Sequence, residues 1–214
     1  RVLPSLAAAL GLFIPASLGA EPLKVVAWNI EWFPGLRAGA SEGEQYKHIM
    51  AVEPALAEIS PDILLAQEIT DQRSMEKLCA TAGLKLHVMS RFIDANTGEP
   101  GLQQQAIASK LEAHSAWFED FKPSADLPNL RRGFAFAALR HPDGGLIMVY
   151  SVHLKSNGGS DRPGGEEDIA RTRRESIKQI LTHKADMEKT KFAGETIIGW
   201  IVGGDMNTNH DGQF

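Results

Sequence analysis

Polar side chains that could bind a phosphate or a metal ion stand at the ends of four apolar segments. They are Asn29 in "VVAWN", Glu68 in "ILLAQE", His153 in "MVYSVH", and Asp205 and Asn207 after "WIVGG". Functional sites gather at strand ends because the sheet holds the groups rigidly while the loops leave them open to solvent. One such residue alone has an ordinary explanation as a turn cap or a core histidine, but four equivalent places together indicate one site.

The residue types indicate chemistry assisted by a hard divalent cation. Carboxylate and amide oxygens suit Mg²⁺, Mn²⁺ or Ca²⁺ rather than zinc, and the chain has no Cys/His spacing for a zinc site. Mg²⁺ typically uses one or two carboxylates together with substrate phosphate and water. The chain has no serine or cysteine elbow, and "GGEEDI" lacks the lysine and the preceding strand of a nucleotide-binding loop.

The segments that must position these residues alternate between strands and helices. Apolar, β-branched runs predict strands at 23–30, 61–69, 84–90, 104–110, 134–140, 145–154 and 195–205. Apolar spacing predicts helices at 46–60, 71–83 and 166–187. We expect Pro54 to kink or split the first helix, and Asp71 and Gly83 to cap the second. The fold class is therefore α/β, with mostly antiparallel sheets covered by helices.

The N-terminal residues 1–20 resemble a secretory signal peptide. They carry Arg1 as their one charged residue and are otherwise mainly apolar, with a cleavage position after Ala20. A membrane anchor is the weaker alternative, because the run is short and Pro4 and Pro15 interrupt it. We expect an exported protein, periplasmic or secreted, with no membrane span in the mature chain. The single cysteine, Cys79, lies on an apolar helical face and is expected to be a buried structural thiol.

The charge of the mature chain does not indicate a broad nucleic-acid-binding surface. Without Arg1, 21 basic residues stand against 27 acidic ones, a net charge of −6, whereas such surfaces are basic. A phosphate-bearing substrate would therefore need local basic groups or a bound cation. Candidates are Arg131 and Arg132, either of which could clamp phosphate with a planar fork, and Lys155, close to His153. Their alternatives are a salt bridge at the rim and a solvated lysine.

Five motifs in this order resemble the endonuclease/exonuclease/phosphatase superfamily, the deoxyribonuclease-I-like fold. They are "WNIEWF", "PDILLAQEI", "GLQQQAIASK", "VHLKS" and "GGDMN", and the resemblance covers roughly residues 23–210. It implies a four-layer α/β/β/α sandwich of two mostly antiparallel sheets and metal-dependent hydrolysis of phosphate esters, with Mg²⁺ as the expected cofactor and Mn²⁺ or Ca²⁺ as alternatives.

The resemblance also implies a role for each matched residue. Glu68 would be the main metal ligand, with Asn29 beside it, and His153 would contact the scissile phosphate. Asp205 would orient or deprotonate the attacking water, and Asn207 would help hold the phosphoryl oxygens. Asp205 and Asn207 can point to the same side if the segment remains extended.

The family pattern ends with a Ser-Asp-His element that this sequence does not show. Residues 208–214, "TNHDGQF", have the wrong order and follow the preceding motif too closely, so His210 is taken as a loop residue. We therefore expect residues 21–214 to be a domain of this superfamily that is incomplete at its C-terminus and lacks its last strands, as a fragment of a longer reading frame would.

Three functions follow from these expectations. The first is an exported, metal-dependent hydrolase of phosphodiester bonds, a nuclease acting on DNA or RNA with no stable protein partner. The second is a phosphatase or phospholipase-type member of the same superfamily, although the net negative charge does not favour anionic membranes. The third is an inactive homologue that binds without catalysis, which the missing histidine would favour.

Overall fold

The computed structural model describes residues 22–94, 97–124, 127 and 130–208. The predicted signal peptide and His210 lie outside these described residues. The helices are α1 (Glu42–Ile59), α2 (Gln72–Thr81) and α3 (Gly165–Lys189). The strands are β1 (Val25–Phe33), β2 (Ile63–Ile69), β3 (Lys85–Met89), β4 (Gln104–Ser109), β5 (Ala113–Asp120), β6 (Gly133–Arg140), β7 (Leu146–His153) and β8 (Ile197–Asp205).

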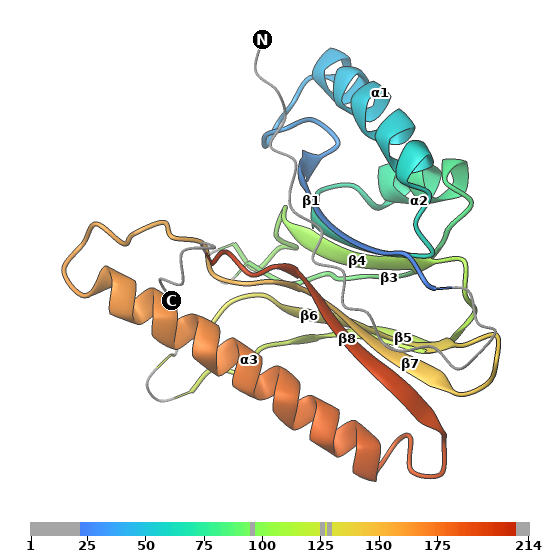
Figure 1. Ribbon diagram of the computed structural model, residues 1–214. Coiled ribbons are helices and arrows are strands. Elements are labelled where there is room, and N and C mark those ends of the chain that lie inside the picture. Colours follow the sequence, from blue (N-terminus) through green and yellow to red (C-terminus); the bar gives the residue numbers. More distant parts are fainter. Residues whose placement is uncertain (1–21, 95–96, 125–126, 128–129, 209–214) are drawn as a thin grey trace.

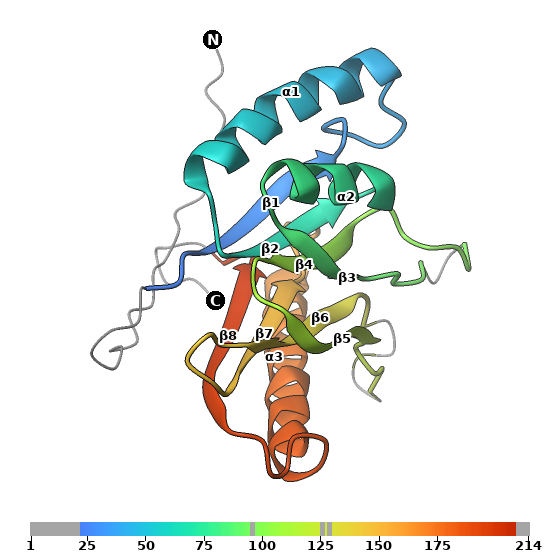
Figure 2. The same ribbon diagram turned by 90° about the vertical axis from the view of Figure 1, so that its right-hand side faces the viewer.

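The strands form two four-stranded sheets that lie face to face. Their orders are β1-β2-β4-β3 and β5-β6-β7-β8. The pairs β1–β2 and β7–β8 are parallel, and the other four pairs are antiparallel. Helices α1 and α2 cover the outer face of the first sheet, and α3 covers the outer face of the second (Figures 1 and 2). This arrangement confirms the predicted four-layer α/β/β/α sandwich.

The apolar core consists of three layers that follow this stacking. One cluster lies between the first sheet and its two helices, one between the two sheets, and one between the second sheet and α3. Strand β7 serves two of them, because Val149 faces the first sheet while Tyr150 and Val152 face α3. All eight residues of β7 are buried, as expected of a strand covered on both faces.

The ends of the helices agree with the sequence signals, but Pro54 does not split the first helix as considered. Asp71 caps α2 by accepting the Ser74 N–H at 2.7 Å, and Gly83 follows with φ 68°. Helix α1 continues unbroken through Pro54. Met50, one turn earlier, is exposed, so water can reach the carbonyl that the proline leaves without a donor. No helix of the described residues is long and apolar enough to cross a bilayer.

Strand β5 is an element that the sequence reading missed. Its segment, "AHSAWFED", contains no β-branched residue and is only partly buried, so it lacks the usual strand signal. It stands at the edge of the second sheet beside β6. Cys79, by contrast, is buried as predicted, and burial raises the pKa of its thiol to about 12.

Candidate active site

Four of the predicted site residues meet at one edge of the sandwich. The amide nitrogen of Asn29 donates hydrogen bonds to Glu68 Oε1 at 3.0 Å and to Asp205 Oδ2 at 2.8 Å. The Nε2 atom of His153 lies 3.7 Å from Glu68 Oε1 and 3.6 Å from Asp205 Oδ2. Two carboxylates, one amide and one imidazole thus surround the same small space.

The parallel strand pairs explain why these residues converge. Because β1 runs parallel to β2, and β7 to β8, the carboxyl ends of each pair lie at one edge of its sheet. Asp205 is the register partner of His153, and β1 and β2 lie against β8 and β7 across the sandwich. Close approach of the sheets depends on Gly203, since a Cβ at this position would lie 2.6 Å from Leu65 Cδ1.

A β-bulge directs Glu68 toward the site. The pairing of β2 with both of its neighbours skips this residue, and its backbone has φ 61°. Strict alternation would place Glu68 on the face covered by the helices, but Ile69 occupies that face instead. The bulge therefore turns a carboxylate to the edge of the sheet, a use that bulges often have near active sites.

The imidazole of His153 is buried behind the two carboxylates. Only 3% of the residue is exposed. Burial and, to a smaller extent, the positive charge of Arg132 lower the pKa of His153 to about 4, although the negative charge of Asp205 acts in the opposite direction. The ring is therefore neutral at physiological pH.

Arg132 is the one of the two predicted arginines that the structure brings to this site. Its Nη1 donates to the carbonyl oxygens of His153 and Leu154, both at 3.2 Å, and its Nη2 donates to Gln103 Oε1 at 2.6 Å. Burial lowers the pKa of Arg132, and the charges of Glu68 and Asp205 act in the opposite direction. This arginine therefore places a fixed positive charge beside the carboxylates.

Arg131 and Lys155 are not in contact with the site carboxylates. Arg131 is exposed and lies 3.9 Å from Asp94 in an ion pair. The ammonium of Lys155 donates to the carbonyls of Ser156 at 3.0 Å and Gly158 at 2.8 Å. Lys155 still belongs to the surroundings of the site, because its pKa is lowered by burial and then by the charges of nearby arginines.

The segment that follows β8 does not remain extended, so the condition under which Asp205 and Asn207 would point to the same side is not met. This residue has φ 53°. Its backbone N–H donates to Asp205 Oδ1 at 2.8 Å, and its side-chain amide donates to Leu154 O at 3.0 Å. The turn is a local side chain-to-backbone arrangement typical of Asp. Asn207 thus holds the Asp205 carboxylate and ties it to the end of β7.

Arg173 is a residue of this region that the sequence reading missed. It lies on α3, is 8% exposed, and donates from Nε to Lys155 O at 2.7 Å and from Nη2 to Asn157 Oδ1. Burial lowers its pKa, while the Asp205 charge raises it. A signal was present, since Arg173 stands four residues from both Ile169 and Ile177 on the inner face of the helix.

The donor set suits a hard divalent cation completed by water or substrate. Glu68 and Asp205 supply carboxylate oxygens, and Glu68 Oε2 accepts no hydrogen bond from the described residues. The described part of the chain contains no group of three or more His, Cys, Asp or Glu side chains that could hold a metal. Mg²⁺ is usually coordinated by only a few protein ligands together with several waters. The amide oxygen of Asn29 accepts the Glu31 N–H at 3.0 Å, so a ligand role for Asn29 requires its amide to turn toward the cation.

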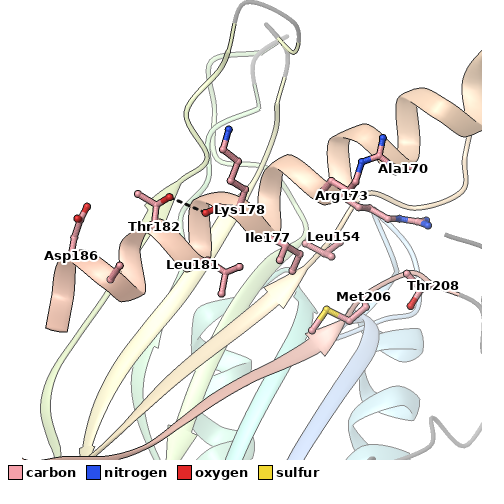
Figure 3. A pocket seen from close by; sticks show the side chains of 12 residues that line it. Leu154, Ala170, Arg173, Ile177, Lys178, Leu181, Thr182, Asp186, Met206 and Thr208 are labelled. Atoms are coloured by element: carbon pink, nitrogen blue, oxygen red, sulfur yellow. Dashed lines mark hydrogen bonds between the residues drawn. The ribbon is translucent and has the colours of Figure 1, made fainter.

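A hollow of about 850 Å³ lies on the other face of the second sheet and is distinct from this site. Figure 3 shows Leu154, Ile177, Leu181 and Met206 lining it beside α3. Leu154 follows His153 and Met206 follows Asp205, so successive side chains at the strand ends alternate between the two faces. The hollow is mainly apolar and contains neither of the site carboxylates.

Comparisons with known proteins place the fold. The sequence matches no protein-family profile and no curated protein. Among solved structures, TDP2 from Caenorhabditis elegans is 18% identical with a TM-score of 0.56, over 90% of this chain and 49% of that one. The mannosyl-6-phosphatase Bt3783 from Bacteroides thetaiotaomicron is 15% identical with a TM-score of 0.59, over 90% and 68%. An endonuclease/exonuclease/phosphatase family protein from the same bacterium is 13% identical with a TM-score of 0.57, over 89% and 65%.

The chain therefore has the fold of the endonuclease/exonuclease/phosphatase superfamily, as its motifs predicted. It spans about half the length of the TDP2 structure and about two thirds of the other two.

Proposed function

We propose that this chain is a divalent-metal-dependent hydrolase of phosphodiester bonds, and specifically a nuclease. The observation that carries the proposal is the group formed by Glu68, Asn29, Asp205 and His153 at the edge of the sandwich. Solved structures with the same fold include a phosphatase and a member of the endonuclease/exonuclease/phosphatase family. Phosphoester hydrolysis is therefore the broad class, and phosphodiester cleavage is the specific proposal.

Each residue has a role that its contacts support. Asp205 is held by the Asn29 amide and the Asn207 N–H, which fixes it to orient and deprotonate a water molecule. His153 Nε2 faces the same space and would contact the scissile phosphate. Glu68, together with Asn29, would hold the cation. The chemistry that Mg²⁺ supplies in such a site is neutralisation of the charge that develops on the phosphate.

Positive charges around the site support an anionic substrate despite the net negative charge of the chain. Arg132 donates to the carbonyl oxygen of Leu154 and Arg173 to that of Lys155, so two arginines and Lys155 lie together at the end of β7. Burial lowers the pKa of Lys155, and the charges of these arginines lower it further. Like charges placed together repel one another, and a bound phosphate relieves that repulsion.

The substrates that the protein cleaves distinguish a nuclease from a phosphatase. The protein should be tested with Mg²⁺, with Mn²⁺ and with EDTA on supercoiled plasmid, RNA, bis(p-nitrophenyl) phosphate and p-nitrophenyl phosphate. We expect cleavage of the diesters that EDTA abolishes. Cleavage of the monoester alone would replace the nuclease with a phosphomonoesterase, the activity named for the Bacteroides structure. No cleavage of any substrate with either metal would leave an inactive binding homologue.

Variants locate the activity in this site. Asp205→Asn and His153→Ala should each lower kcat by at least about a hundredfold, the range expected for a general base or a group that stabilises the transition state. Glu68→Gln should also abolish the increase in melting temperature that Mg²⁺ causes, a readout independent of turnover. Glu58→Gln, an exposed change on α1, is the matched control and should behave as wild type.

We also propose that the protein is exported, on the pattern of residues 1–20 alone. Fusing residues 1–30 to a reporter that is active only outside the cytoplasm tests it, with Leu10→Arg as the variant that interrupts the apolar run. A reporter that stays inactive with the unaltered segment would refute export.

A further inference from the structure

A buried polar layer lies between the two sheets, next to His153. Gln67 and Gln105 are register partners on β2 and β4 and are fully buried. Gln67 Nε2 donates to Ser151 Oγ at 3.0 Å, two residues before His153 on β7. Gln105 Nε2 donates to Gly133 O at 3.2 Å. Phe134 pairs with Val152 in the antiparallel pair β6–β7. The groups to which the two glutamines donate therefore lie next to His153 in the sheet, one on its own strand and one on the neighbouring strand.

This layer has too few hydrogen-bond donors. Gln67 Oε1, Gln105 Oε1 and His153 Nδ1 are buried and have no hydrogen-bond partner among the described residues. The amide orientations are fixed, because Gln67 Nε2 also donates to Leu65 O at 3.0 Å and Gln105 Nε2 donates to a backbone carbonyl as well. Turning either amide would set its oxygen against a carbonyl oxygen. Both glutamine oxygens are therefore acceptors in need of a donor.

On the opposite side of the imidazole, Nε2 does not face buried groups that lack a hydrogen-bond partner in the described part of the chain. Nε2 faces Glu68 and Asp205 beyond hydrogen-bonding distance, and the Asp205 side chain is 26% exposed, so water can reach this space. A neutral imidazole has one proton to place. On Nδ1 that proton can serve, through a water, the buried acceptors that have no partner among the described residues. A second water can donate to Nε2 and to a carboxylate oxygen at the same time.

We propose that His153 carries its proton on Nδ1 and donates it through one buried water to the oxygens of Gln67 and Gln105. A water that accepts from Nδ1–H can donate to both oxygens, which satisfies the whole layer. The two glutamines are then positioning residues that fix the tautomer and the orientation of the ring.

This inference rests on the proposed function for its consequence. With Nδ1 engaged in the layer, Nε2 is the nitrogen that can take up a proton from water, and the imidazolium that forms can donate this proton to an oxygen of the phosphate. It is also the nitrogen that faces the carboxylates and the substrate. Gln67 and Gln105 would thus decide where the histidine accepts a proton without touching the substrate.

The tautomer can be measured directly by ¹⁵N NMR on the full chain with labelled histidine, at neutral pH in EDTA. The His153 signals are assigned by their loss in His153→Gln. We expect a protonated Nδ1 and an unprotonated Nε2 in the wild type, retention of this form in Gln105→Glu, and a shift toward protonated Nε2 in Gln105→Leu. Wild-type protein with its proton on Nε2 would overturn the proposal, even if Gln105→Leu does not fold.

A matched control is available next to this residue. Gln104 is also buried but bonds to Ser90, Phe92 and Gly101 instead, so Gln104→Leu should lower stability and leave the His153 tautomer unchanged. Gln105→Leu should lower kcat about tenfold with little change in KM, the loss expected for one hydrogen bond, and Gln105→Glu should restore it. An unchanged kcat in Gln105→Leu would refute the positioning role.

The two proposals fail separately. A protonated Nδ1 in a protein that cleaves no phosphoester would refute the enzyme function and leave the tautomer standing. An active nuclease in which His153 carries its proton on Nε2 would refute the tautomer and leave the enzyme function standing.

Discussion

Burial of neutral His153 should make the stability of the protein depend on pH in a defined window. Its pKa is about 4 in the folded chain against an ordinary value of 6.5. Between these two values the unfolded chain binds one proton more than the folded one, so stability falls as pH falls. The slope approaches about 1.4 kcal/mol per pH unit. Integrated from about pH 7.5 to about pH 4.5, the loss from this residue is about 2.5 kcal/mol.

Urea unfolding of wild type and His153→Gln across this range, at constant ionic strength, measures that loss. EDTA should be present, because metal binding is itself pH-dependent. Burial also lowers the pKa values of His48, His87 and His183, but these three residues remain in both proteins. The difference in unfolding free energy between the two proteins should therefore change by about 2.5 kcal/mol. If the unfolding free energies of the two proteins changed in parallel with pH, the reasoning would be refuted. That result would mean that His153 can be protonated in the folded protein without loss of stability.

Three further predictions concern stability and reactivity. Cys79, with its thiol pKa raised to about 12, should react with a disulfide reagent only after unfolding; reaction at the rate of a free thiol in native buffer would contradict this. Gly204→Ala should lose at least about 3 kcal/mol in urea unfolding, because its φ is 140° and the new Cβ would lie 2.0 Å from Val152 O; Gly43→Ala, with open space around it, is the control. Asp71→Ala should cost about 1 kcal/mol through loss of the α2 cap, and an unchanged melting temperature would exclude that role.

Local sequence patterns predicted most of the fold and the membership of the site. Apolar runs placed seven of the eight strands, and β5 escaped because its segment has no β-branched residue. The polar residues Asn29, Glu68, His153 and Asp205 were found from their places at the ends of apolar runs, where a sheet holds side chains rigidly beside open loops. The parallel pairs β1–β2 and β7–β8, which the sequence did not predict, bring these residues together.

Features that depend on backbone conformation or on tertiary contacts could not be predicted in this way. The bulge at Glu68 and the turn at Asn207 both place a non-glycine residue at positive φ, which no periodicity signals. Arg173 reaches the surroundings of the site only through the packing of α3. The unpaired atoms of Gln67 and Gln105 become visible only when the partners of every buried polar group are known.

The hydrogen bond from Asn29 to Asp205 joins one sheet to the other. The site therefore spans two sheets that have no backbone pairing with each other. The distance between its carboxylates is therefore set by the thickness of the layer between the sheets, in which Leu65 packs where Gly203 leaves room. Substituting a side chain in that layer would widen or narrow the site without changing any residue in it. Core volume, which is usually discussed as a determinant of stability, is in this fold also a determinant of the separation between Glu68 and Asp205.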